Sequence, residues 1–227
     1  TYDLLFGCPG WIQGVIQADA FIKAGIGKRF LIIGAEALSR VVDDYDRDSM
    51  IYSDGAGAVI IDAAEEETKR GVLSSSMQTD TADEAYYLFL GPSNKPGANP
   101  KRRYIKMHGR KIYEYAISKV PAAMKLAMDR SGVDIADIKK VLIHQANEKM
   151  DEAIVKRFYR LYKEKMPDNI MPMSIHFLGN SSVATVPTLY DRILKGECPE
   201  HKINKEDVLL FASVGAGMNI NSFVYRK

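Results

Sequence analysis

Cysteine and histidine are scarce in this sequence, with two and four among 227 residues. Cys8 and Cys198 lie near opposite ends of the chain, so they form no disulfide framework, and the sequence predicts a protein of a reducing, cytoplasmic compartment. The histidines stand at 108, 144, 176 and 201 and show no metal-ligand spacing such as His-x-x-x-His. We therefore expect no metal site.

Net charge and long apolar runs are also limited. The net charge is only +2, which gives little reason to expect nucleic acid as a partner. No apolar run approaches the ~20 residues of a membrane span, and the N-terminus lacks the basic region of a signal peptide. The chain starts at Thr1 and leads straight into an expected strand. We therefore expect that an N-terminal segment of a longer protein is missing.

Apolar segments of two kinds alternate along the chain. Short apolar runs predict strands, and longer segments with helical spacing predict helices. Strands are expected at residues 3–7, 30–34, 54–61, 71–77, 141–143, 208–212 and 219–225, and helices at 9–24, 108–131, 148–165 and up to about 194. Residues 78–104 are expected to be irregular. Because several strands are apolar on both faces, the pattern predicts an α/β architecture with helices on both sides of a sheet.

Cys8 stands where the first apolar run meets the first helical pattern. Pro9 suits the first turn of a helix, since the amide that it lacks would have no partner there. Cys8 is thus expected at a helix N-terminus, where free amides and the helix dipole favour a thiolate. The alternative is a small buried residue, which is what most free cysteines are.

Two further polar residues stand at the ends of predicted elements. His144 follows the apolar run 141–143, and Asn180 follows Gly179 before a predicted helix. An imidazole can accept or stabilise the proton of a thiol, and a carboxamide can donate to an oxyanion. The alternatives are a histidine satisfied by the backbone and a helix N-cap.

The order of these motifs resembles one family. Its motifs are Cys8, the SDGAGA run at 53–58, HQAN at 144–147, GNSSVA at 179–184 and GAG at 215–217. Together they resemble the β-ketoacyl-acyl-carrier-protein synthase III group of condensing enzymes. The resemblance implies the thiolase-like fold, with layers α-β-α-β-α and two related sheet halves, the first incomplete. We predict the halves at residues 1–70, with the nucleophile, and 71–227, with the histidine and asparagine.

The resemblance also implies a mechanism. Cys8 would accept an acyl group from acyl-CoA, and His144 and Asn180 would hold a malonyl thioester during decarboxylation. The enolate formed would then attack the acyl-cysteine, in the step that initiates fatty acid synthesis. The backbone amides of Cys8 and Gly217 would stabilise the acyl-transfer oxyanion. Apart from the CoA and carrier-protein thioesters, no cofactor is expected. Ala216 departs from the glycine that is common at its position.

A basic face follows His144. Lys149, Lys156, Arg157 and Arg160 fall near one side of the predicted helix, and the resemblance implies that they dock an acidic acyl carrier protein. A merely solvated cationic face is the alternative. The resemblance further implies a homodimer. Two other functions stay open: a specialised synthase of polyketide-like or dialkyl-lipid biosynthesis, and a non-catalytic fragment or subunit.

Overall fold

The computed structural model describes residues 1–65 and 67–227. Its helices are α1 (Gly10–Lys23), α2 (Gly109–Ser131), α3 (Glu148–Arg160), α4 (Ile175–Leu178) and α5 (Thr185–Leu194). Its strands are β1 (Arg29–Ala37), β2 (Asp54–Asp62), β3 (Gly71–Thr79), β4 (Leu88–Gly91), β5 (Tyr104–Met107), β6 (Ile138–Ile143), β7 (Val208–Gly215) and β8 (Asn219–Arg226). Short 3₁₀ turns include Ser182–Ala184, directly before α5.

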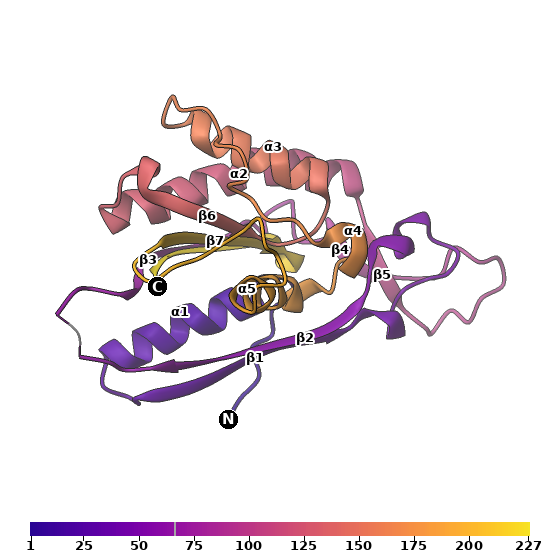
Figure 1. The fold of residues 1–227 in the computed structure, drawn as a ribbon. Helices are drawn as coiled ribbons and strands as arrows, with labels where there is room; N and C mark the ends of the chain where they lie inside the picture. Colours follow the sequence, from indigo (N-terminus) through magenta and orange to yellow (C-terminus); the bar gives the residue numbers. More distant parts are fainter. Residues whose placement is uncertain (66) are drawn as a thin grey trace.

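A four-stranded sheet forms the centre, in the order β3-β8-β7-β6. The β6–β7 pair is parallel and the other pairs are antiparallel. Helices α2 and α3 cover one face, and α1 and α5 separate the other face from an antiparallel β1–β2 ribbon (Figure 1). The described residues thus form four layers, α-β-α-β. They do not supply the fifth layer of the expected arrangement beyond the ribbon.

Strand β7 lies at the centre because it is apolar on both faces. Every one of its residues is buried. Leu210 and Ala212 pack with Met124 of α2 on one side, and Phe211 packs with Trp11 of α1 on the other. Its apolar run predicted this arrangement correctly. The ring of Phe211 also stacks on Phe223 of β8 at 4.5 Å between centroids.

Most predicted elements are confirmed, but the strand at residues 3–7 is wrong. Residues 1–6 have no regular structure, Leu5 is 96% exposed, and the Phe6 amide donates to the Leu4 carbonyl in a tight turn. A strand needs a hydrogen-bonded neighbour, and no described residue pairs with this segment. The expected helix at 148–165 also ends early, at Arg160.

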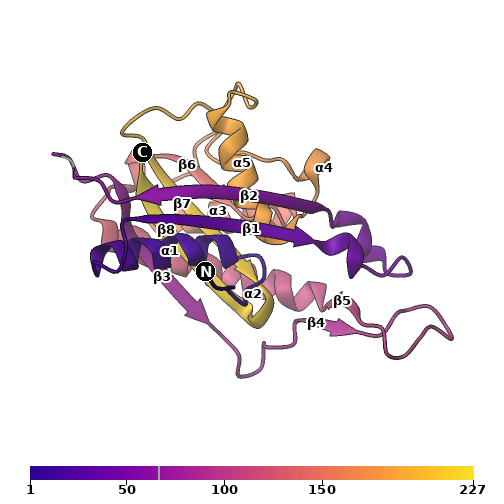
Figure 2. The ribbon, with the colours of Figure 1, turned by 90° about the horizontal axis from the view of Figure 1, so that it is seen from below.

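The region expected to be irregular contains the hairpin β4–β5. It lies beside the connector between β1 and β2 and projects with it at one end of the molecule (Figure 2). Lys106 of β5 fastens the two segments, because its Nζ lies 2.6 Å from both Asp43 Oδ2 and Asp46 Oδ2. These three side chains are largely buried, so the ion pairs hold the hairpin against the connector. The predicted division into halves 1–70 and 71–227 stays a prediction.

Candidate active site

Cys8 lies two residues before α1, with Pro9 at the N-cap position. The Ser182 hydroxyl donates to its Sγ at 3.4 Å. Burial raises the pKa of the Cys8 thiol to about 11, although this hydrogen bond opposes the rise. Desolvation thus opposes the thiolate that a helix N-terminus favours, and it is the larger effect here. The resting sulfur is a thiol.

His144 follows the last residue of β6, and its backbone amide donates to the Ala212 carbonyl of β7 at 2.9 Å. The ring is buried, with Nδ1 2.7 Å from Thr185 Oγ1. Burial lowers the pKa of His144 to about 4, so the imidazole is neutral at pH 7. No described residue bonds to Nε2. The alternative of a histidine satisfied by the backbone does not apply to the ring, whose partner is a side chain.

Asn180 follows α4 and Gly179, whose φ of +70° suits glycine. Its backbone amide donates to the Ile51 carbonyl at 2.7 Å. Its Oδ1 accepts from the Ser182 amide at 2.8 Å, which leaves Nδ2 as the free end of the carboxamide among the described residues. The side chain does not cap α5, but its Oδ1 accepts the amide of the first residue of the 3₁₀ turn Ser182–Ala184. The N-cap alternative is therefore wrong for α5 and holds in part for this turn.

The three side chains line one cavity of about 620 Å³. Apolar residues form most of its wall: Leu38, Val41, Ile51, Tyr52, Leu88, Leu90, Ile105, Met107, Ile112, Met150, Val214 and Met218. Many of them come from β4, β5 and the β1–β2 connector. A second hollow of about 850 Å³, between α1, β2 and β8, contains none of the three. The first cavity therefore joins an apolar chamber to one thiol and two potential N–H donors.

The turn after β7 closes the cavity beside Cys8. A Cβ on Gly215 would lie 2.9 Å from the Cys8 amide nitrogen, so only glycine fits there. Gly215 and Ala216 line the cavity, whereas Gly217 does not. Gly215 is therefore the residue of this turn that lies against Cys8, and the oxyanion role expected for the Gly217 amide stays a prediction. The φ of Ala216 is not positive, which explains why alanine can replace glycine at this position.

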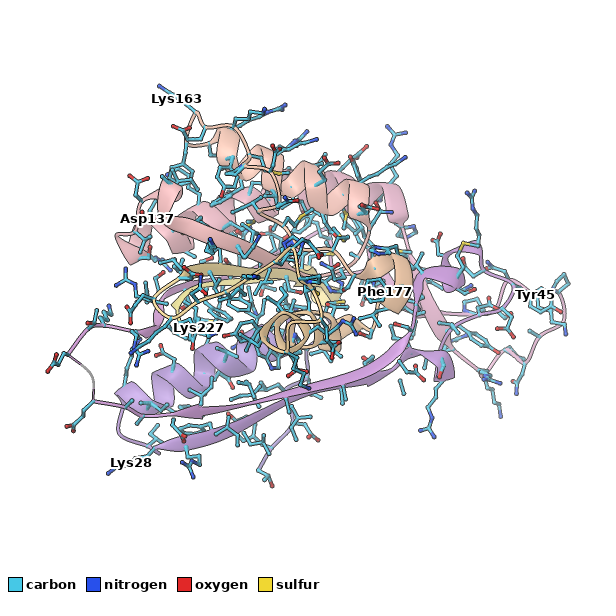
Figure 3. All side chains as sticks on the ribbon, in the orientation of Figure 1. Lys28, Tyr45, Asp137, Lys163, Phe177 and Lys227 are labelled. Carbon is cyan, nitrogen blue, oxygen red and sulfur yellow. The ribbon has the colours of Figure 1, made fainter. Side chains whose placement is uncertain are left out.

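The basic residues predicted on α3 are all exposed. Helix α3 starts at the cavity, where Asn147 and Met150 line it, and leads outward to a loop whose tip carries Lys163 (Figure 3). Lys156 pairs with Glu152 at 2.6 Å. Arg157 Nη1 donates to the Ile117 carbonyl of α2 at 2.9 Å. Lys149 is the basic residue closest to the cavity along the helix, and Arg157 has a structural partner.

Sequence reasoning missed two residues of the site, Ser182 and Thr185. Ser182 lies inside the motif at 179–184, but nothing in the sequence indicates its contact with Cys8. Thr185 belongs to no motif that we recognised. Both contacts join segments far apart in the chain, so only the folded structure identifies them.

No helix among the described residues could cross a membrane. Within the same residues, no group of three His, Cys, Asp or Glu side chains is placed to hold a metal ion.

The fold is that of an α/β protein, and one cavity brings a cysteine thiol together with a histidine and an asparagine. The family model of 3-oxoacyl-[acyl-carrier-protein] synthase III matches residues 2–81 of this chain. The model of the C-terminal part of the same enzyme matches residues 128–227. The chain belongs to this family, and its fold is thiolase-like.

Relatives of known name agree with this assignment. The β-ketoacyl-[acyl-carrier-protein] synthase III of Microcystis aeruginosa is 30% identical over all of this chain and 67% of its own length. The crystal structure of the β-ketoacyl-[acyl-carrier-protein] synthase III of Thermus thermophilus has a TM-score of 0.85 and is 29% identical. The match covers 100% of this chain and 67% of the Thermus chain. A priming β-ketosynthase of the R1128 polyketide pathway shares the fold, with a TM-score of 0.85 at 22% identity over 99% of this chain and 65% of its own.

Proposed function

We propose that the protein condenses an acyl thioester with a malonyl thioester and thereby starts fatty acid synthesis. The observation that carries this proposal is the common cavity of Cys8, His144 and Asn180, in which a thiol faces two side chains with unengaged nitrogen atoms. The apolar wall suits an acyl chain. The neutral state of His144 suits a donor that stabilises an enolate without an external base.

In the first step, Cys8 attacks the carbonyl of an acyl-CoA. A bond forms between Sγ and the acyl carbon, the bond from that carbon to the CoA sulfur breaks, and the Cys8 proton ends on the leaving CoA thiolate. The intermediate carries an oxyanion, for which we propose the backbone amides of Cys8 and Gly217 as donors. Because the resting sulfur is a thiol, proton removal belongs to this step.

In the second step, the malonyl thioester loses carbon dioxide as its carbon–carbon bond breaks. The negative charge moves to the thioester oxygen, where Nε2–H of His144 and Nδ2–H of Asn180 would donate. The carbanion attacks the acyl-cysteine, a new carbon–carbon bond forms, and Cys8 is released and takes up a proton. We propose that no further cofactor takes part, because decarboxylation itself supplies the nucleophile.

Two partners are proposed. The malonyl group would arrive on acyl carrier protein, an acidic partner that matches the exposed Lys149 at the cavity end of α3 and Arg160 at its outer end. A homodimer would form through the β1–β2 side of the molecule. Two free cysteines, Cys8 and Cys198, support a reducing, cytoplasmic location.

The alternatives differ in what the cavity must do. A specialised synthase of polyketide or dialkyl-lipid synthesis would use the same three residues with another acyl substrate. The R1128 enzyme has the same fold, so the experiment below includes acyl-CoAs of several chain lengths. A non-catalytic subunit would have no use for a sulfur placed beside two donors. The retained geometry therefore favours an enzyme.

Acyl transfer tests the proposal directly. The chain is incubated with radiolabelled acyl-CoA of several chain lengths, and the labelled peptide is identified. We expect label on Cys8, none in Cys8→Ala, and full label in the matched control Cys198→Ala. A protein that takes up no label from any acyl-CoA would refute the proposed first step.

A further inference from the structure

Ser182 has an unusual backbone for its residue type. Its φ is +54°, in the left-handed region, and the residue is 5% exposed. For a residue with a Cβ, this conformation costs about 1 kcal/mol or more. Such a cost persists only where surrounding contacts fix the conformation, so the contacts of Ser182 indicate what the strain achieves.

Each polar group of Ser182 leads to a different member of the site. Its Oγ donates to Cys8 Sγ at 3.4 Å, and its amide donates to Asn180 Oδ1 at 2.8 Å. Its carbonyl accepts from Thr185 Oγ1 at 3.0 Å, and that oxygen lies 2.7 Å from His144 Nδ1. One residue therefore touches the sulfur and the carboxamide directly and the imidazole through Thr185.

We propose that Ser182 is the positioning residue of the site: it holds Cys8 and Asn180 directly, and through its carbonyl it keeps the Thr185 hydroxyl within reach of His144. The proposal rests on the function proposed above for these three residues. A right-handed or extended backbone at residue 182 would turn its amide and carbonyl to other directions. The strained conformation is what allows one residue to make all three contacts.

The three contacts have different chemical consequences. The hydroxyl contact strengthens as the Cys8 proton leaves, since a thiolate is a better acceptor than a thiol. The amide contact occupies Oδ1 of Asn180, so that the NH₂ end is the part left for a substrate oxygen. The Thr185 hydroxyl has one proton and two acceptors in reach, the Ser182 carbonyl and His144 Nδ1. The two contacts exclude each other: while the hydroxyl donates to the Ser182 carbonyl, it accepts from Nδ1–H of His144 and Nε2 is an acceptor. Only when the hydroxyl turns to Nδ1 does the neutral ring carry its proton on Nε2, the tautomer that the decarboxylation step uses.

The hydroxyl contact is tested by alkylation of Cys8 with iodoacetamide at pH 9, followed by peptide mass spectrometry. Ser182→Ala and Ser182→Gly both remove the hydroxyl, and glycine also removes the backbone strain, so at least one variant folds. We expect a three- to tenfold slower reaction of Cys8 in both, with Cys198 as internal reference. The matched control Ser181→Ala is expected to react like the parent chain.

Unchanged or faster alkylation of Cys8 in both Ser182 variants would overturn the proposal. This readout needs no acyl transfer, so it stays informative if the chain fails to accept an acyl group. Conversely, the Ser182 variants could slow the alkylation of Cys8 as expected while the chain takes up no acyl label. That result would support the positioning role of Ser182 and reject the proposed function.

The histidine contact is tested separately at Thr185. Thr185→Val keeps the shape but removes the hydroxyl, whereas Thr185→Ser keeps the hydroxyl. We expect malonyl decarboxylation to fall about tenfold in the valine variant and to recover in the serine variant, with Cys8 alkylation unchanged in both. Equal decarboxylation by the valine variant and the parent would refute the link from Ser182 to His144.

Discussion

Burial controls ionisation at the residue scale. A helix N-terminus stabilises a negative charge by 0.3–1 kcal/mol, and up to about 2 in partly buried sites. The rise in the pKa of Cys8 from 9.0 to about 11 corresponds to about 3 kcal/mol against the thiolate. Desolvation is therefore the larger effect, and the hydrogen bond from Ser182 opposes it.

His144 makes a prediction about acid stability. Its pKa is about 4 in the folded chain and 6.5 in the unfolded chain, so between these values the unfolded state binds more protons. Stability contributed by the neutral ring is complete above pH 6.5 and is lost as the pH falls toward 4. The loss amounts to about 3 kcal/mol.

The measurement is the free energy of unfolding of the chain and of His144→Gln, by urea titration at pH 7 and pH 4.5. The parent is expected to lose about 2–3 kcal/mol more than the variant over this interval. Buried carboxylates affect both proteins alike and cancel in the comparison. Parallel losses would mean that His144 titrates normally.

At the element scale, a side chain of α3 replaces a backbone hydrogen bond that α2 lacks. Pro121 lies inside α2 and has no amide to donate to the Ile117 carbonyl one turn earlier. Arg157 of α3 donates to that carbonyl at 2.9 Å. An arginine that the sequence assigned to partner docking thus also replaces a missing helix hydrogen bond.

This arrangement predicts coupling between Arg157 and Pro121. Arg157→Ala is expected to destabilise the chain by about 1 kcal/mol, because the Ile117 carbonyl loses a charged donor. In a Pro121→Ala background the helix supplies its own donor, and the cost of Arg157→Ala is expected to nearly vanish. A double-mutant cycle in urea measures the coupling. Equal costs in both backgrounds would show that the contact contributes nothing.

The outer face of α3 makes a separate prediction about the carrier protein. Lys149→Glu reverses an exposed charge at the cavity end of the helix, and we expect the KM for a malonyl carrier-protein substrate to rise several-fold, with kcat little changed. Lys139→Glu, a charge reversal remote from α3, is the control. An unchanged KM in Lys149→Glu would show that this side of α3 does not bind the carrier protein.

At the scale of the whole molecule, the β1–β2 ribbon carries an apolar outer face. Leu31, Ile33 and Ile60 are 62%, 63% and 60% exposed, and Leu31 lies opposite Ile60 in the register. Side chains alternate along a strand, so the inner face packs on α1 and α5 while these residues point outward. An apolar patch of this kind marks an interaction surface.

We predict that this chain self-associates through the ribbon. Ile33→Lys places a charge at the centre of the patch and is expected to shift sedimentation toward the monomer at tens of micromolar protein. Met77→Lys, an exposed apolar position on β3, is the matched control. Association that persists in the Ile33 variant would place the contact elsewhere.

Much of the fold and the three polar residues of the cavity could be predicted from local patterns. The apolar run of β7 required burial on both faces, and Cys8, His144 and Asn180 each stand at an element end within an ordered motif. The segment at 3–7 misled because an apolar run becomes a strand only beside a partner. The hairpin β4–β5 escaped notice because its strands are short and lie among prolines and glycines.

By itself, the sequence determined the α/β class, the order of elements and the residues that meet at the cavity, since periodicity and motif order are written along the chain. Only the tertiary structure decided the protonation of Cys8 and His144, the place of Gly215 against Cys8 and the contacts of Ser182. The physical reason is that desolvation and hydrogen-bond direction depend on atoms from distant segments. Those atoms come together only when the chain folds.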